Sequence, residues 1–434
     1  MRGRALLVAG LAVLLLSFPA SAGAHAVLVS SAPRWGGALS GAPRSLRLEY
    51  SEDVVGRYAR VTVVTADGRN LARRARAAGP VVVVALRPGP KGSYTVHWQM
   101  VASDDGHVTE GAFSYGVGVK PLPPGPVPGV GVPVAPELLA WLEFLGVALA
   151  GGMLVFRALV WAPAAWVLGE AGPRDTPVAI WAAVAGAVLA LHAGMLAFLV
   201  GAYPIVGAGG LANFADAQIV PIRIGTHLGQ AFAVMTFAWL LVLALLVSAW
   251  VTPRIREELL ASAGALSLAL ALGISWASHP ASRGTLALAA DYVHLLAAAL
   301  WVGGLLGLLI LAGVMRPLSR TARDAVFRAS LLRFSRVAMP TVVVLALAGA
   351  YLALRELPGP SALFTSGWGI TLLLKSLVAL GAVTLGGYHH RFVVPRLAAG
   401  ARVATIRRTL SVEASLLLLA LALAAVLGQS APPG

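Results

Sequence analysis

The sequence predicts a two-part protein, with a small all-β sandwich ahead of an all-α bundle of eight transmembrane helices. Three observations predict this class. Only 12% of the 434 residues are charged and 58% are hydrophobic, whereas a soluble protein carries about 25% charged residues. Residues 25–120 contain short apolar runs separated by turn residues, which is typical of strands. Eight later segments are long and apolar enough to cross a bilayer.

The first 24 residues have the composition of a secretion signal. A basic start at Met1–Arg4 precedes a short apolar run, and Ala22–Ala24 offers the small residues of a cleavage site. We therefore expect residues 1–24 to be removed, so that His25 begins the mature chain. An uncleaved anchor is the alternative, but the apolar run is short for a membrane span. Cleavage implies that the domain that follows lies outside the cytoplasm.

Residues 25–120 are predicted to form the β-sandwich, because several short strands occur in fewer than 100 residues. A turn is expected at Asp67-Gly68. Residues 121–136 are rich in Pro and Gly and are predicted to form a linker. The expected strands are Ala26–Ser31, Arg44–Ser51, Ala59–Thr65, Val81–Leu86, Ser93–Val101 and Gly111–Val119.

The predicted metal chemistry of this domain uses its first residue and a short acidic segment. As a free N-terminal residue, His25 offers both its α-amine and a ring nitrogen to one metal ion. Asp105 and His107 are two residues apart, so their side chains share a face in an extended segment. An amine, two imidazoles and a carboxylate form a set that favours Cu(II). For an isolated Asp-Gly-His sequence, a polar turn with a solvated histidine is the alternative.

Five segments of the domain occur in a specific order. They are His25–Leu28 with Pro33, Leu46–Glu52, Tyr94–Trp98, Asp105–His107 and Gly111–Tyr115. Together they resemble the CopC family of periplasmic copper-binding proteins. The resemblance implies a β-sandwich that binds Cu(II) through His25, Asp105 and His107. We do not expect the methionine-rich Cu(I) site of some members, because Met100 is the domain's only methionine.

Residues 137–428 are predicted to form the membrane domain, followed by a tail at 429–434. With the N-terminal domain outside, the cytoplasmic loops carry 15 arginines, against three on the outer side. This asymmetry agrees with the positive-inside rule and places both termini outside the cytoplasm of a bacterial inner-membrane protein. The net charge of +15 therefore reflects topology, and no nucleic acid partner is expected. The spans are expected near Glu137–Val160, Val178–Ala202, Gly225–Trp250, Glu257–Ala277, Leu286–Val314, Val337–Leu354, Trp368–His390 and Thr409–Leu427.

Polar residues on and beside the fifth span are functional candidates, because they are costly in lipid. Asp291 and His294 are three residues apart and share a helix face. The carboxylate could orient the imidazole or hold its charge. His279 lies in the loop before this span. Lys375 of the seventh span is expected to snorkel, or to pair with Asp291 or Glu356.

Three further side chains are metal candidates. His192 and Met195 are three residues apart on the second span, and an imidazole with a thioether suits copper, especially Cu(I). His227 lies near the outer end of the third span. Interhelical hydrogen bonding is the alternative for His192, His227 and His294, and core filling is the alternative for Met195. His389-His390 is predicted to be a basic cluster at the inner membrane surface.

Several membrane segments also match a known pattern. They are Asp291–Leu305, Trp276–His279, Arg333–Ala338, Gly369–Lys375 and Arg408–Ala414. These segments resemble the CopD family of copper-resistance membrane proteins. Ser278 stands where that family usually has Gly. The resemblance implies movement of copper across the inner membrane, or its handling there.

The sequence therefore predicts a copper-binding protein that captures Cu(II) outside the cytoplasm and passes copper across the membrane, with periplasmic copper donors as potential partners. It contains no cysteine, no phosphate-binding loop and no large cytoplasmic domain, so we expect neither an enzyme nor an ATP-driven pump. One alternative is a haem b electron-transfer protein or metalloreductase, with His192, His227 and His294 as axial ligands. Another is copper sensing or storage without transport.

Overall fold

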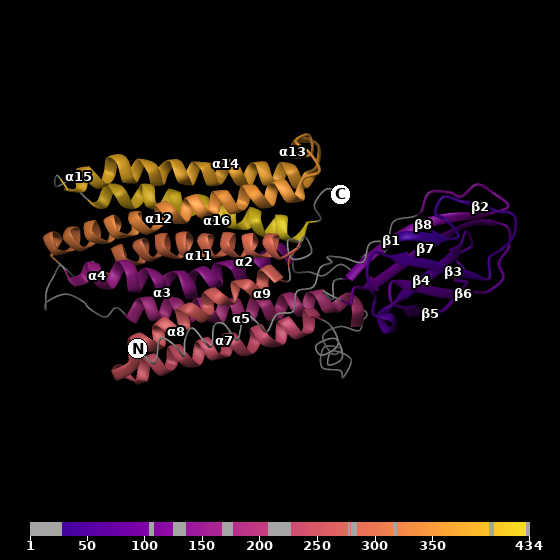
Figure 1. Cartoon of the computed structure of the whole chain (residues 1–434), viewed down its shortest axis with the longest axis horizontal. Coiled ribbons are helices and arrows are strands. Elements are labelled where there is room, and N and C mark those ends of the chain that lie inside the picture. The colour runs from indigo at the N-terminus through magenta and orange to yellow at the C-terminus, as the bar shows by residue number, and fades with distance from the viewer. Residues whose placement is uncertain are drawn as a thin grey trace. The chain divides into compact units, whose positions relative to one another are not determined.

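The chain folds into two compact units, one containing the strands and one containing most of the helices (Figure 1). We describe each unit by itself. The computed structural model describes residues 28–103, 108–124, 136–166, 177–206, 227–276, 278, 284–315, 319–398 and 403–430.

Two four-stranded sheets form the β unit, which confirms the predicted sandwich. They enclose one core, in which Leu46 and Leu48 from one sheet meet Val96 and Met100 from the other. Alternate residues face this core, as expected of strands covered on one face. One sheet has the order β1 (Leu28–Ala32), β3 (Ser45–Tyr50), β6 (Val81–Leu86) and β5 (Ala72–Ala78), and the other has β2 (Ala38–Leu39), β8 (Val108–Val117), β7 (Gly92–Val101) and β4 (Arg60–Thr65).

Two of these strands, β2 and β5, were not among the predicted ones. β5 has the sequence Ala-Arg-Arg-Ala-Arg-Ala-Ala and lies at an edge of its sheet. Its exposed arginines hide the apolar alternation that identifies a strand. Charged side chains on an edge strand also discourage pairing with other chains, which gives them a structural role.

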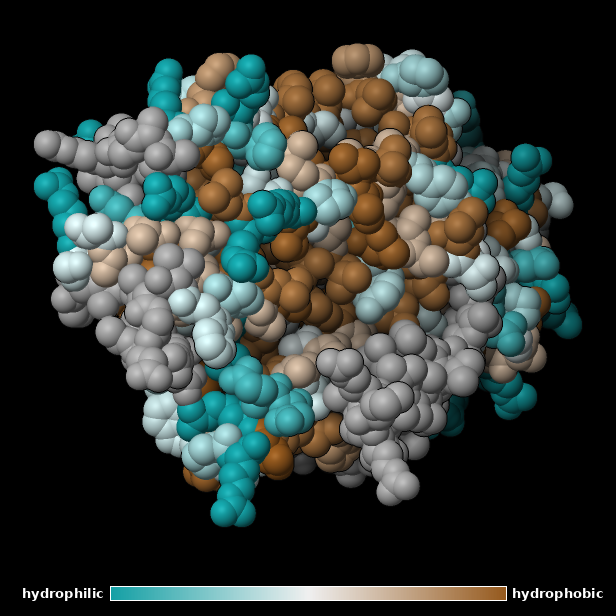
Figure 2. Space-filling model, turned by 60° about the vertical axis from the view of Figure 1, so that its left-hand side comes forward, coloured by the Kyte–Doolittle hydropathy of each residue, from teal (hydrophilic) through white to brown (hydrophobic). Residues whose placement is uncertain are grey.

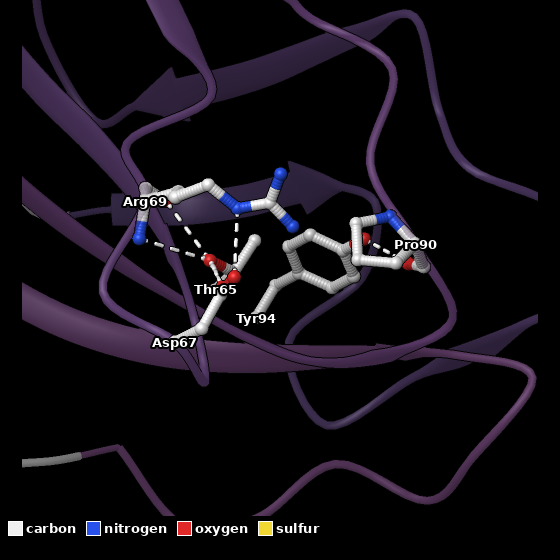
Figure 3. A network of polar contacts seen from close by, with 5 residues as sticks. All are labelled: Thr65, Asp67, Arg69, Pro90 and Tyr94. Atoms are coloured by element: carbon white, nitrogen blue, oxygen red, sulfur yellow. Dashed lines mark hydrogen bonds and ion pairs between the residues drawn. The ribbon is translucent and has the colours of Figure 1, made fainter.

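The turn predicted at Asp67-Gly68 is present and is fixed by side-chain contacts (Figure 3). The Asp67 carboxylate accepts a hydrogen bond from the Thr65 hydroxyl and another from Arg69 Nε at 2.7 Å. These contacts hold the pKa of Asp67 below its usual value, with the Thr65 bond as the largest cause. Beside the turn, the Tyr94 hydroxyl donates to the Pro90 carbonyl and ties β7 to the chain before it.

The helical part contains eight described helices that are long and apolar enough to cross a membrane, as predicted. Many of their apolar side chains face outward, including Phe237, Leu347 and Leu354, which are 72%, 67% and 80% exposed. Figure 2 shows hydrophobic side chains filling the middle of one face of the molecule. Outward apolar side chains on long helices are what lipid contact requires.

The eight spans are built from the following elements. The first combines α2 (Pro136–Val147), the π-helix η2 (Ala148–Gly152), α3 (Met153–Phe156), the π-helix η3 (Arg157–Trp161) and α4 (Ala162–Ala165). The next three are α5 (Pro177–Val206), α7 (His227–Val251), and η6 (Pro253–Ile255) with α8 (Arg256–Ala269) and α9 (Ala271–Trp276). The last four are α11 (Thr285–Val314), α12 (Arg320–Glu356), α14 (Gly367–Tyr388) with η7 (His389–Val393) and α15 (Val394–Ala398), and α16 (Val403–Gln429); the short α13 (Ala362–Thr365) precedes α14.

The sixth helix is much longer than predicted, because it begins at Arg320 instead of Val337. The arginines in its first part interrupt the apolar run by which a membrane span is recognised, so the sequence analysis did not include that part. Phe327 and Leu331 of this part are nevertheless buried in the helical core. At 1.5 Å per residue, α12 is about 55 Å long. That exceeds a hydrocarbon core of about 30 Å, so the arginine-rich part extends beyond the apolar layer.

Glycines bring the first span and α11 into backbone contact. A Cβ atom on Gly152 would collide with the Ala299 carbonyl oxygen, and one on Gly303 would lie 2.7 Å from the Cα of Gly152. Small residues at helix crossings allow this close approach in membranes. The contact fixes the position of α11, which carries Asp291 and His294.

Candidate functional site

A cavity of about 150 Å³ lies inside the helical part, where α2, α9, α11, α12, α14 and α16 meet. In Figure 1, α11, α12, α14 and α16 run side by side, in agreement with their contacts. Most of the lining is apolar. The polar residues that line it, which we call the cavity cluster, are Ser278, Asp291, His294, Glu356 and Lys375.

The imidazole of His294 is held in one orientation by α12. Its Nδ1 lies 2.9 Å from the Leu345 carbonyl oxygen. A carbonyl only accepts, so Nδ1 carries the hydrogen and the lone pair of a neutral ring is on Nε2. Metal-binding histidines typically use this arrangement, donating their other N–H to a carbonyl or carboxylate. Among the described residues none is hydrogen-bonded to Nε2, so this nitrogen can bind a metal ion.

Gly349 makes this contact possible. A Cβ atom at residue 349 would lie 2.8 Å from Cε1 of the His294 ring. Of the two roles predicted for Asp291, orienting the imidazole is not what the structure shows, because a backbone carbonyl of α12 bonds to Nδ1; holding its charge stays a prediction. The two side chains do line the same cavity, as their spacing predicted.

The cavity cluster contains two carboxyl groups and one amine. The Asp291 carboxylate accepts a hydrogen bond from the Ser278 hydroxyl at 3.1 Å and lies close enough to Lys375 for their charges to interact. Of the two partners predicted for Lys375, the structure thus supports Asp291. Glu356 is 6% exposed and adds a second carboxyl group. With both carboxylates ionised and His294 neutral, the cluster has a net charge of −1, which favours a cation.

The remaining membrane candidates do not join this cluster. His192 is exposed on α5, with Nδ1 2.8 Å from the Val188 carbonyl oxygen of its own helix, and Met195 is 40% exposed. Neither is among the described residues that line the cavity. His227 begins α7, and its side chain lies outside what the structure describes. His279 also lies outside the described residues.

His25, Asp105 and His107, predicted as the Cu(II) site, lie outside the described residues as well. The residues that flank them are linked through one part of the sandwich. Leu28, at the start of β1, pairs with Tyr50 at the end of β3. The chain after Tyr50 then bonds to the chain after β7, through the Val54–Ala102 bridge and a 2.9 Å bond from the Ser103 N–H to the Asp53 carbonyl. The start of β1 and the end of β7 therefore lie at the same end of the sandwich.

No three His, Asp or Glu side chains in the described part of the chain are grouped closely enough to form a metal site. The cavity cluster thus offers one imidazole nitrogen with carboxylates nearby, instead of a closed ligand set.

Two polar sites inside the helical part were missed by the sequence analysis, one at Glu143 and one at His389. Glu143 of the first span faces α5, where a Cβ on Gly194 would lie 3.2 Å from its Oε1. Its position within an otherwise apolar run was a signal by which the sequence analysis could have identified it. His389 was expected in a basic surface cluster, but it is buried against Glu413, whereas His390 is exposed as expected. No sequence signal separates these adjacent histidines.

Comparison with known proteins identifies both parts. The model of the CopC domain matches residues 28–118, and that of copper resistance protein D matches residues 328–427. The chain joins a CopC domain to a CopD domain. Residues 328–427 include most of α12 and the α14 and α16 spans, and so Glu356 and Lys375. They do not include α11, so the resemblance of Asp291–Leu305 to CopD stays a prediction.

Two relatives are similar to this chain. The copper transport protein CutJ of Bacillus subtilis (strain 168) is 24% identical over 419 residues, which cover 93% of this chain and 73% of CutJ. The crystal structure of CopC from Methylosinus trichosporium OB3b is 22% identical, covers 21% of this chain and 93% of that one, and has a TM-score of 0.21.

Proposed function

We propose that this CopC–CopD chain captures Cu(II) outside the cytoplasm and passes copper inward through the cavity cluster. The observation that carries the proposal is the cavity itself, in which a metal-accessible imidazole nitrogen lies beside two carboxyl groups. It is lined in part by the helices of the CopD match, in the same chain as a CopC domain. The name of the relative CutJ agrees with copper transport.

Capture would use His25, Asp105 and His107. After cleavage behind Ala24, His25 supplies an amine and an imidazole, and the other two supply a carboxylate and an imidazole. The common position of the flanking segments at one end of the sandwich supports this set. Its nitrogen and oxygen donors favour Cu(II). The positive-inside rule supports an extracytoplasmic position for this domain and for the C-terminus.

Passage would use His294 Nε2 as the first ligand in the cavity, with His279 and His227 as ligands on the outer approach. Lys375 balances Asp291 while the cavity is empty. An arriving copper ion replaces part of this positive charge, so the carboxylates stabilise it without a closed coordination shell. The neutral imidazole and the carboxylates accept either oxidation state of copper, although they favour Cu(II).

The haem alternative gains no support from the described residues. His192 bonds to its own helix and does not share the cavity with His294. A cavity of about 150 Å³ is also below the range of about 300–1,000 Å³ that is usual for organic ligands. A Soret band in the purified protein would restore this alternative.

Uptake of radioactive copper into proteoliposomes tests the proposal. We expect wild-type protein to carry copper into the lumen. We expect His25→Ala to lower the rate at limiting copper but not at saturating copper, because only capture is impaired. Stable binding without accumulation in the lumen would replace transport with storage or sensing. Unchanged uptake by His25→Ala at limiting copper would remove the capture role.

A further inference from the structure

A second buried polar cluster lies at the other end of α14 and is distinct from the cavity. His389 Nδ1 is 2.8 Å from Glu413 Oε2, and His389 Nε2 is 2.8 Å from the Thr409 hydroxyl. His389 and Glu413 are 4% and 2% exposed. His389 begins the π-helical turn η7, and such turns often occur at functional sites. We call His389, Thr409 and Glu413 the His389 cluster.

The hydrogen bonds of this cluster determine how many protons it holds. The Thr409 hydroxyl donates its one hydrogen to the Ile406 carbonyl, 2.9 Å away. It therefore accepts at the His389 ring, and Nε2 must be the donor. With Glu413 ionised, Nδ1 is a donor as well and the ring is an imidazolium. With Glu413 protonated, the carboxyl group donates to Nδ1 instead, and in both cases the pair holds one proton more than a neutral imidazole beside a carboxylate.

The same two helices carry both clusters. Lys375 and His389 are fourteen residues apart on α14 and η7, which is about 21 Å at 1.5 Å per residue. α16 supplies Glu413 to one cluster and Leu427 to the lining of the cavity. In the proposed orientation, the His389 cluster lies at the cytoplasmic end. If copper in the cavity displaces α14 relative to α16, the displacement would also change the hydrogen bond between His389 and Glu413.

We propose that the His389 cluster is a proton site of the transport cycle, so that copper enters together with a proton. This inference rests on the proposed copper transport and names the coupled ion. In the release step, Nε2–H of the imidazolium breaks and its proton passes to water at the cytoplasmic end. The ring becomes neutral and keeps Nδ1–H bonded to Glu413. The Thr409 hydroxyl then turns from Ile406 and donates to the lone pair of Nε2, so every buried group stays hydrogen-bonded.

Few other groups near the cluster titrate at neutral pH. On α16, the titratable group in contact with His389 is Glu413. On α14, the ring centroid of Tyr388 lies 6.1 Å from that of the imidazole. His390, next in the chain, bonds to Ser335 of α12. The charged residues of α12 nearest to Ser335, and those of η7, α15 and α16 other than Glu413, are arginines, which stay protonated throughout; they are Arg333 and Arg336 on α12, Arg391 on η7, Arg396 on α15, and Arg407 and Arg408 on α16. Asp324 and Glu356 lie eleven and twenty-one residues from Ser335 along α12, and Lys375 lies fourteen residues from His389.

The test measures copper and pH together in proteoliposomes of the full-length protein, with radioactive copper outside and a pH dye in the lumen. For the wild type, we expect an outside pH one unit lower to speed copper uptake at least about threefold. The lumen should acidify in step, beyond protein-free vesicles. Glu413→Gln should lose this acceleration but keep copper-for-copper exchange at equal pH within about twofold. Ser335→Ala, which removes a contact of exposed His390, should behave as the wild type.

The outcomes separate the two proposals. Copper uptake that neither responds to the pH gradient nor acidifies the lumen overturns the proton site alone. Alkalinisation of the lumen during uptake overturns the shared direction of copper and proton. Loss of exchange together with acceleration in both Glu413→Gln and Thr409→Val assigns the cluster a structural role and overturns the inference. Absence of any copper flux in the wild type overturns the proposed function and this inference with it.

Discussion

The cavity cluster and the His389 cluster place charged residues in the same apolar bundle but use them differently. In the cavity cluster, His294 keeps Nε2 available, and two carboxyl groups face one ammonium group. In the His389 cluster, both ring nitrogens are bonded to α16. A buried polar group with unused bonding capacity can take up an ion, whereas a saturated one fixes structure or holds a proton. On our proposals, this difference separates the path of copper from the site that couples it to a proton.

The largest expected effect follows from removing the metal-accessible imidazole. His294→Ala should lower copper flux at least about tenfold. Even the loss of a residue that only supports a metal ligand typically lowers metal affinity or activity about 10- to 100-fold. Its matched control is His390→Ala, which removes an exposed imidazole in the same bundle. The control should retain nearly full flux in the same proteoliposome assay. Equal losses in the two variants would remove the distinction between the cavity and the rest of the bundle.

The two clusters should also differ in their contribution to stability. His389→Phe leaves Glu413 buried without its partner, and breaking a buried pair costs about 3–5 kcal/mol. His294→Ala should cost far less, because its ring already faces a cavity. Thermal unfolding of both variants in detergent measures this difference. A smaller loss of stability in His389→Phe than in His294→Ala would contradict the contrast.

A milder change tests the orientation of His294 without removing it. Gly349→Ala places a methyl group 2.8 Å from the ring carbon Cε1, so the imidazole must shift. At the low end of overpacking costs, about 1 kcal/mol, copper flux should fall about fivefold. Gly387→Ala on α14 is the control, since nothing lies within 4 Å of a Cβ there. Flux that is unchanged in Gly349→Ala would show that the Leu345 contact does not set the ring position.

The smallest effect belongs to the β unit and should leave transport unaltered. The pKa of Asp67 is lowered in the folded chain by the Thr65 hydrogen bond and by Arg69. Its contribution to stability is therefore present above the unfolded pKa of about 3.9 and is lost as pH falls through the folded value. Asp67→Asn should unfold more readily than the wild type at pH 7, and this difference should shrink toward pH 3. A difference that is constant between these pH values would show that the turn does not depend on the charge of Asp67.

Much of this architecture could be predicted from the sequence, because burial imposes a regular spacing of apolar residues along helices and strands. The eight spans and six of the strands have continuous or alternating apolar residues, and the spacing of Asp291 and His294 predicted a shared face. β5 was missed because its arginines obscure the pattern. The Leu345 contact and the burial of His389 could not be predicted, because they depend on how α11, α12, α14 and α16 meet in three dimensions.

The central claim is that copper in the membrane domain binds at His294. X-ray absorption of full-length protein carrying His25→Ala and His107→Ala, loaded with one equivalent of copper, tests it most directly, since the predicted outer site is then disabled. We predict imidazole scattering around copper that disappears when His294→Ala is added. An unchanged copper environment in that triple variant would contradict the account.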